Sequence, residues 1–205
     1  MGSHASRTVT SLGPTCESAN SWPLTRSDKA TFGEYLDGEF MSYALSHLVR
    51  AQAYADHNKT SLVREDPFGY GMDGTVWRTT RHSAVKVFEH EKNYDDELEC
   101  YQRFADAGVE DLSGFKIPSL LGFHDKLRVI ELKIVRPPFL LDFGKVYLDA
   151  PPPYWDDAEI MGHWHAEGRE NFGERWSKVM SLIGMLQKYG IWYVDPKTGN
   201  IMFGD

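Results

Sequence analysis

Apolar residues recur at helical spacing in the first part of the chain and at strand spacing after it. Residues 39–56 repeat apolar side chains every three or four positions, which predicts an amphipathic helix that packs on the following domain. From Ser61 onward, β-branched and aromatic residues flank a short glycine-rich stretch. This pattern predicts three consecutive antiparallel strands between Ser61 and Phe88.

The rest of the chain alternates between the same two kinds of pattern. We expect, in chain order, a helix over 95–107, strands over 115–123 and 127–135, a helix over 172–189 and a short strand over 201–203. The 172–189 helix has the clearest spacing, and Gly190 suits its C-terminal cap. Tryptophans are expected to pack within the core or between its parts: Trp155, Trp164, Trp176 and Trp192.

Composition and charge narrow the classes of function. The formal net charge of -8 argues against general binding to nucleic acid or to an anionic membrane, because both need Lys and Arg to neutralise phosphate. No apolar run approaches the ~20 residues of a membrane helix, and the N-terminus has no signal-peptide core. The cysteines Cys16 and Cys100 form no disulfide framework, so a reducing, cytoplasmic compartment is expected.

The glycine-rich stretch has the spacing G-x-G-x-x-G at Gly69, Gly71 and Gly74. In a dinucleotide-binding fold the third glycine would open a helix, whereas here β-branched residues that favour a strand follow it. A glycine loop between antiparallel strands is typical of a flap that covers phosphates, because glycine lets backbone N–H groups approach them closely. The alternative is an ordinary glycine-rich hairpin.

Lys86 lies in a run of apolar residues on a predicted strand, where its charge needs a partner. The partner is expected to be an acid on the following helix, either Glu97 or Glu99. We favour Glu97, because it shares a helical face with Tyr101 and Phe104. In the alternative interpretation Lys86 lies on an edge strand and extends its ammonium group to water.

The stretch from Asp195 to Asn200 has the spacing D-x-K-x-x-N, with Lys197 two positions after the aspartate. In phosphoryl transfer an aspartate can accept the proton of an incoming hydroxyl, a lysine can steady the transferred group, and an asparagine can bind Mg²⁺. The alternative is an Asx turn, since Asp-Pro and Thr-Gly-Asn favour turns.

These three stretches together resemble the protein-kinase-like superfamily over residues 61–205. The resemblance implies an α+β fold with a five-stranded antiparallel small lobe, one regulatory helix and an abbreviated, mainly helical large lobe. It divides the chain into a disordered or loosely packed tail (1–36), a helix packing on the domain (37–58), the small lobe (59–136) and a hinge with a truncated large lobe (137–205).

The resemblance also implies ATP and Mg²⁺ as cofactors and a hydroxyl as the phosphate acceptor. Asp195 would be the catalytic base, Lys86 and Lys197 would bind phosphate, and Asn200 would bind the metal. Adenine would meet backbone groups near 135–138. The rest of the nucleotide site would be formed by Gly69, Gly71, Gly74, Val76, Ala84 and Glu97.

The second metal-binding aspartate of the family, in D-F-G, is expected about a dozen residues after the asparagine. The chain ends before that point, so Asp205 is the only acid left to act as that ligand. The letters D-F-G occur at Asp142-Phe143-Gly144, but ahead of the catalytic loop, and we interpret them as a coincidence.

These departures leave two alternatives to an active enzyme. One is a pseudokinase, a nucleotide-binding or scaffolding module without transfer. The other is a half-enzyme completed by a protein partner or by self-association through the truncated large lobe. The sequence His163-Trp164-His165 matches no helical metal-ligand pair, and we expect a solvated loop there.

Overall fold

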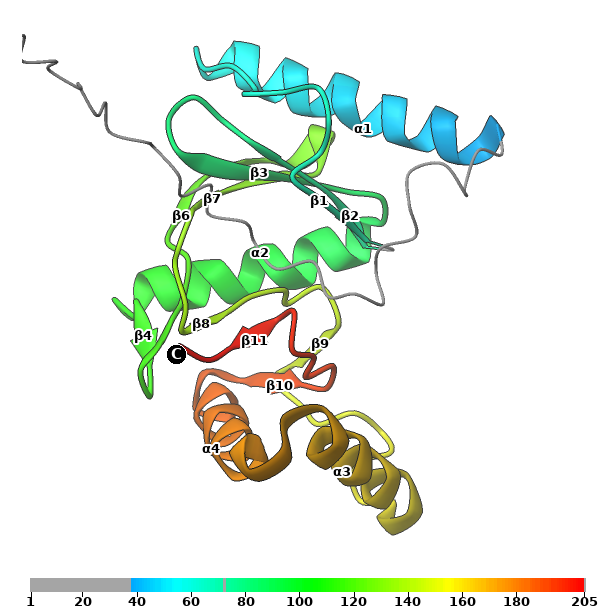
Figure 1. Cartoon of the computed structure of the whole chain (residues 1–205), viewed down its shortest axis with the longest axis vertical. Helices are drawn as coiled ribbons and strands as arrows, with labels where there is room; N and C mark the ends of the chain where they lie inside the picture. The colour runs from blue at the N-terminus through cyan, green and yellow to red at the C-terminus, as the bar shows by residue number, and fades with distance from the viewer. Residues whose placement is uncertain (1–37, 72, 205) are drawn as a thin grey trace, which may run out of the picture.

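The structure of the protein is a computed structural model that describes residues 38–71 and 73–204. Figure 1 shows its elements in successive layers, with α1 above a sheet, α2 below it, short strands next, and α3 and α4 at the opposite end. The predicted tail over 1–36 and the candidate ligand Asp205 lie outside the described residues.

The helices are α1 (Gly38–His57), α2 (Glu91–Asp106), α3 (Ala158–Phe172) and α4 (Trp176–Leu186), with short 3-10 turns at Asp125–Leu127, Gly173–Arg175 and Gln187–Tyr189. The strands are β1 (Gly69–Gly71), β2 (Gly74–Arg78), β3 (Ser83–Phe88), β4 (Asp111–Leu112), β5 (Phe115–Lys116), β6 (Leu120–His124), β7 (Val129–Lys133), β8 (Phe139–Leu140), β9 (Val146–Leu148), β10 (Ile191–Tyr193) and β11 (Ile201–Met202).

The main sheet has five antiparallel strands in the order β1-β2-β3-β7-β6. The predicted α+β class and the three consecutive strands around the glycine stretch are therefore confirmed, as is the helix that precedes them. Because β3 lies between β2 and β7, it is a central strand, and the edge-strand interpretation of Lys86 is wrong.

Alternation along β3 and β7 separates the two faces of this sheet. Val85, Val87 and Val129 face α1 and form a core with Tyr54 and Trp77. Each such buried side chain contributes about 1.5–3 kcal/mol through removal of apolar surface from water. Alternate positions of the same strands face α2 instead, because successive side chains of a strand point to opposite faces.

Polar contacts fix α1 on its face of the sheet. Arg50 donates to the carbonyls of Leu127 and Phe88, the latter at 2.7 Å. The Tyr54 hydroxyl donates to the Glu131 carboxylate at 3.0 Å, and Ser83 donates to the same carboxylate. Since these groups are largely buried, loss of one partner would leave another unsatisfied.

Below α2, strands from distant parts of the chain pair with each other. β9 pairs with β10, and β8 pairs with β11, both antiparallel. β8 also pairs in parallel with β5, which extends this small sheet to β4. The largest apolar core runs from α2 through these strands to α4.

Two sequence predictions differ from the structure in this region. The strand expected over 115–123 is broken between β5 and β6, where Pro118 has no N–H to donate to a ladder. The solvated loop expected at His163-Trp164-His165 is wrong, since these residues lie within α3. The Asp157 side chain caps this helix by accepting from the N–H groups of Glu159 and Ile160.

The helix predicted over 95–107 is present as α2, but it begins at Glu91. Its first turn is polar, so the apolar spacing gave no signal there, although the ring of Tyr94 is buried against Phe88. The tryptophans pack as expected: Trp164 contacts Trp176 and Trp155, and Trp155 contacts Trp192.

Candidate functional site

A cavity of about 210 Å³ opens between the glycine stretch and the strands below α2. Most of the predicted nucleotide-site residues line it: Gly69, Gly71, Gly74, Val76, Ala84, Lys86, Glu97 and Asn200. Asp195 and Lys197 do not line it, and the sequence analysis missed Asp73, Tyr101 and Asp142, which do. The tertiary structure thus gathers residues from widely separated parts of the chain around one space.

The glycines of the stretch are required for different reasons. A side chain at Gly74 would place its Cβ 2.2 Å from the carbonyl oxygen of Val87, so close strand packing by itself demands glycine there. At Gly69 and Gly71, apart from the chain neighbours of each glycine, no atom of the described residues would lie within 4 Å of a Cβ. Packing against the described residues therefore does not explain these two, whereas close approach of a ligand to the backbone would.

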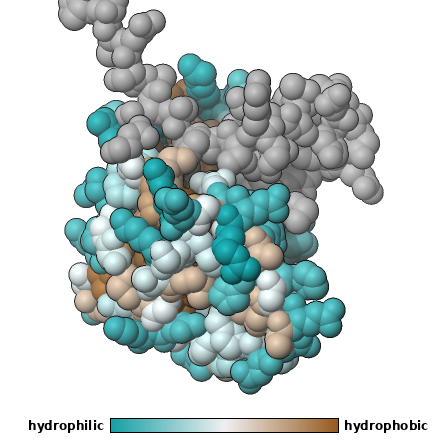
Figure 2. All heavy atoms as spheres, turned by 60° about the horizontal axis from the view of Figure 1, so that its bottom comes forward, coloured by the Kyte–Doolittle hydropathy of each residue, from teal (hydrophilic) through white to brown (hydrophobic). Residues whose placement is uncertain are grey.

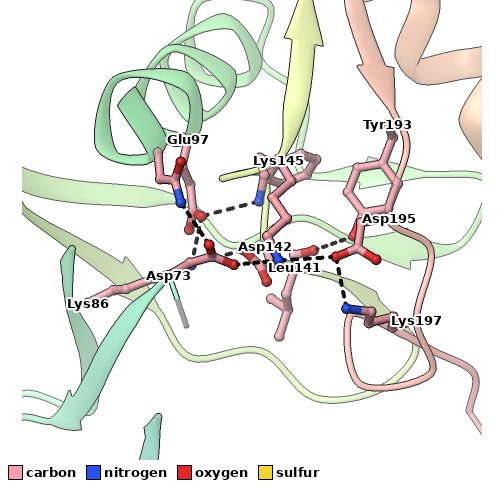
Figure 3. Close-up of polar contacts among 11 residues, drawn as sticks. Asp73, Lys86, Glu97, Leu141, Asp142, Lys145, Tyr193, Asp195 and Lys197 are labelled. Atoms are coloured by element: carbon pink, nitrogen blue, oxygen red, sulfur yellow. Dashed lines mark hydrogen bonds and ion pairs between the residues drawn. The ribbon is translucent and has the colours of Figure 1, made fainter. Parts of the chain in front are cut away.

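Lys86 lies at the centre of an ion-pair cluster (Figure 3). Its ammonium nitrogen is 2.7 Å from the Glu97 carboxylate and 3.0 Å from the Asp142 carboxylate. The predicted pairing with Glu97 is confirmed, and Glu99 instead pairs with Arg103 at 2.9 Å. Only 13% of the Lys86 side chain and 1% of that of Glu97 are exposed, so the pair is screened little by water.

Burial and mutual charge shift the pKa values of the cluster in opposite directions. Burial raises the pKa of Glu97 to about 7, with the Asp142 charge adding to the rise and the Lys86 charge opposing it. Burial also opposes ionisation of Asp142, but attraction by Lys86 outweighs it and lowers the pKa of that carboxyl. For Lys86, the two acids outweigh the effect of burial and raise its pKa, so it remains charged.

Asp142, the first residue of the D-F-G letters that the sequence analysis interprets as a coincidence, contacts Lys86 and lines the cavity together with Asn200. The pairing of β8 with β11 explains this position. The N–H of Leu141 donates to the carbonyl of Asn200 at 2.8 Å, which joins the end of β8 to the predicted catalytic loop. An aspartate that precedes the loop in sequence is thereby its neighbour in space.

Aromatic packing holds this segment in place. The buried ring of Phe143 lies edge-on to Tyr101 at 5.3 Å and to Tyr193 at 5.8 Å between ring centroids. The Tyr193 hydroxyl donates to the carbonyl of Leu141 at 3.1 Å. The Phe143 N–H donates to Glu97 at 3.2 Å, so the backbone around Asp142 is tied to both α2 and β10.

Asp195 lies beyond the cavity and faces two lysines (Figure 3). Its carboxylate is 3.1 Å from Lys197 and 3.7 Å from Lys145. The same Lys145 ammonium group is 3.2 Å from Asp73 in the glycine stretch. No periodic pattern marks Lys145 or Asp73, although Asp73 lies within the glycine stretch and Lys145 directly follows Asp142-Phe143-Gly144.

The loop from Asp195 to Asn200 is closed by its backbone. The N–H groups of Asn200 and Ile201 donate to the Lys197 carbonyl at 2.9 and 2.8 Å. The Asp195 carboxylate pairs with the two lysines instead of closing an Asx turn. The start of the loop is held by α3, since the indole N–H of Trp164 donates to the Val194 carbonyl at 2.8 Å.

A magnesium site would have to combine few protein ligands with ligands from a substrate. Within residues 38–71 and 73–204, no group of three or more His, Cys, Asp and Glu side chains is arranged to hold a metal ion. Asp142 and Asn200, which line the same cavity, offer a carboxylate and an amide oxygen. Such oxygen donors suit Mg²⁺, which usually keeps several waters and binds substrate phosphates.

Comparison of the chain with models of protein families, with curated proteins and with solved structures gave no match. Among the described helices, none has the length and apolar content needed to cross a membrane. The fold and the site define an α+β protein with a cavity in which a buried lysine is held by two acids.

Proposed function

We propose that the protein is a kinase-like phosphotransferase that binds Mg-ATP and transfers its terminal phosphoryl group to a hydroxyl. The observation that carries this proposal is the convergence of Lys86, Glu97, Asp142 and Asn200 on one cavity beneath the glycine stretch. In the protein-kinase-like superfamily, which these residues resemble, a strand lysine contacts the phosphates, a helix glutamate pairs with that lysine, and an aspartate and an asparagine bind the metal.

The charge of the cluster favours a nucleotide complexed with a metal ion. Lys86 supplies one positive charge, whereas Glu97 and Asp142 supply up to two negative charges. Free ATP would be repelled by this surplus, whereas a divalent cation beside Asp142 would offset it. Asp142 and Asn200 would hold Mg²⁺, which neutralises charge on the phosphoryl oxygens during transfer.

The position of Asp142 bears directly on the pseudokinase alternative. That alternative rests on the absence of a metal-binding aspartate after the asparagine. Pairing of β8 with β11 supplies an aspartate at this point of the site from an earlier segment of the chain. We therefore favour Asp142 over Asp205 as the second metal ligand.

Asp195 and Lys197, which lie outside the lining of the cavity, would carry the chemical step. Asp195 would accept the proton of the acceptor hydroxyl while the acceptor oxygen bonds to the γ-phosphorus. The bond from that phosphorus to the β,γ-bridging oxygen breaks, and ADP leaves. Lys197, 3.1 Å from Asp195, would stabilise charge on the transferred group.

Two observations favour the pseudokinase as a second candidate. The cavity of about 210 Å³ is smaller than the roughly 300–1,000 Å³ of common ligand pockets, so ATP requires some opening of the site. The Asp195 carboxylate is also engaged by Lys145 and Lys197 in this state.

The half-enzyme alternative predicts an apolar surface near the last described residues. Phe203 there packs edge-on against Phe115 and lies beneath Arg175. Figure 2 shows the end of the molecule that carries α3 and α4, where hydrophobic residues form small groups separated by hydrophilic ones. Completion by a partner or by self-association stays a prediction.

Calorimetric titration with ATP, with and without Mg²⁺, followed by assay of phosphate release, tests these candidates. We expect Mg²⁺-dependent binding and turnover in the wild type, a higher Mg²⁺ requirement in Asp142→Asn, and binding without turnover in Asp195→Asn. Binding without turnover in the wild type would favour the pseudokinase. Absence of nucleotide binding in both conditions would overturn the proposal.

A further inference from the structure

The tip of the glycine stretch carries an acid that is tied down at two points. One carboxylate oxygen of Asp73 accepts a hydrogen bond from the Asn93 amide on α2 at 2.7 Å. The other lies 3.2 Å from the ammonium nitrogen of Lys145. Only 17% of the Asp73 side chain is exposed, so this acid lies within the site and not in bulk water.

Lys145 lies between Asp73, which lines the cavity, and Asp195, which does not (Figure 3). It follows the Asp142-Phe143-Gly144 segment and reaches Asp73 on one side and Asp195, at 3.7 Å, on the other. The lysine thus stands between the loop proposed to cover the phosphates and the proposed catalytic base. With 37% of its side chain exposed, it is also accessible to an incoming ligand.

We propose that Lys145 binds the terminal phosphate of the nucleotide, and that Asp73 occupies this phosphate position while the site is empty. The inference rests on the proposed nucleotide-binding function. A carboxylate oxygen and a phosphate oxygen are equivalent acceptors for a lysine ammonium group. Binding of a triphosphate therefore exchanges one anion for the other and releases Asp73 from Lys145.

Repulsion between the Asp73 carboxylate and the phosphate oxygens supports this exchange. An aspartate in a phosphate-covering loop places a negative charge where negative oxygens must bind, and in a partly buried site this repulsion is screened only weakly. The pairing with Lys145 stabilises the empty site, and its loss on binding opposes affinity. Asp73 thus competes with the terminal phosphate for Lys145. The lysine pairs with Asp73 in the empty site and with the phosphate in the nucleotide complex.

The test compares a non-hydrolysable ATP analogue with ADP, both with Mg²⁺, by calorimetry. Lys145→Ala should weaken binding of the analogue about ten- to a hundredfold and leave ADP affinity within about threefold, because ADP has no terminal phosphate to contact. Lys145→Arg should restore much of the loss. Asp73→Asn, which keeps an oxygen to accept from Asn93, should tighten binding of the analogue severalfold.

Lys92→Ala is the matched control, because it removes a lysine whose partner Asp96 lies on the same helix and whose side chain is 77% exposed. Its affinities should equal those of the wild type. Thermal unfolding of every variant separates loss of contact from loss of fold.

Equal weakening of ADP and the analogue in Lys145→Ala would overturn the terminal-phosphate assignment. Weakened binding in Asp73→Asn would overturn the competitor role and make the aspartate a support of the loop. If the wild type binds neither nucleotide, the proposed function fails and this inference fails with it. If Lys86→Met weakens both nucleotides while Lys145→Ala and Asp73→Asn change nothing, only this inference fails.

Discussion

The backbone N–H of Leu141 donates a hydrogen bond to the carbonyl of Asn200 across the β8–β11 pair, at 2.8 Å. This contact brings Asp142, one residue further on, beside a loop that begins more than fifty positions later in the sequence. The ion pair of Asp142 with Lys86 then links Asp142 and the neighbouring loop to the main sheet. The following predictions test how this arrangement stabilises the protein and binds a ligand.

Replacement of Lys86 should abolish most nucleotide affinity. Lys86→Met keeps the apolar part of the side chain but removes the charge, and we expect binding of Mg-ATP to weaken about ten- to a hundredfold. Circular dichroism should show an intact fold. Unchanged affinity in a folded Lys86→Met protein would contradict the assignment of Lys86 as a phosphate ligand.

The raised pKa of Glu97 predicts a pH-dependent stability. Its pKa is about 7 in the folded protein against 4.5 as the ordinary value. Between these values the folded protein holds a proton that the unfolded chain has lost. The stabilisation is therefore fully present below pH 4.5 and is lost as pH rises through 7, by up to ~3 kcal/mol.

Denaturant unfolding at pH 5 and pH 8 measures this effect. The wild type should lose stability relative to Glu97→Gln between these pH values, since glutamine cannot titrate. Glu99→Gln is the matched control on the same helix, because Glu99 is 44% exposed and pairs with Arg103. A wild type and a Glu97→Gln variant with parallel pH profiles would show that Glu97 does not carry the proton.

The close packing of α3 on α4 predicts opposite effects for two glycines of one helix. A Cβ at Gly168 would lie 2.3–2.5 Å from the Trp176 ring, so Gly168→Ala should destabilise the protein by about 1–3 kcal/mol. At Gly162 a Cβ would meet none of the described residues outside its own stretch of helix within 4 Å, and Gly162→Ala should stabilise the helix by about 0.5–1 kcal/mol. Denaturant unfolding midpoints measure the stability of both variants. Equal shifts of the midpoint in Gly168→Ala and Gly162→Ala would argue against this packing of α3 on α4.

The choice between Asp142 and Asp205 as metal ligand has a direct test. Phosphate release measured over a range of Mg²⁺ concentrations should require much more metal in Asp142→Asn and be unchanged in Asp205→Asn. The reason is that Asp142 lines the cavity together with Asn200. A raised metal requirement in Asp205→Asn alone would reverse the assignment.

The sequence by itself determined the features that depend on spacing within one element. The apolar run around Lys86 indicated that its charge needs a partner, and helical spacing favoured Glu97 over Glu99 as that partner. The glycine stretch and the 195–200 loop were also visible, because turns and strands impose residue types locally. These patterns indicated the helices, the strands and the central ion pair, whereas the α+β class was implied by the resemblance to the protein-kinase-like superfamily.

Only the tertiary structure decided which distant segments meet. The role of Asp142 depends on pairing between β8 and β11, and the contact of Asp73 with Lys145 depends on how the glycine stretch lies over that pair. Neither leaves a periodic signal, because pairing of distant segments is set by the packing of the whole core rather than by local spacing. For the same reason the sequence predicts a solvated loop at His163-Trp164-His165, whereas these residues lie in α3 and Trp164 packs on Trp176.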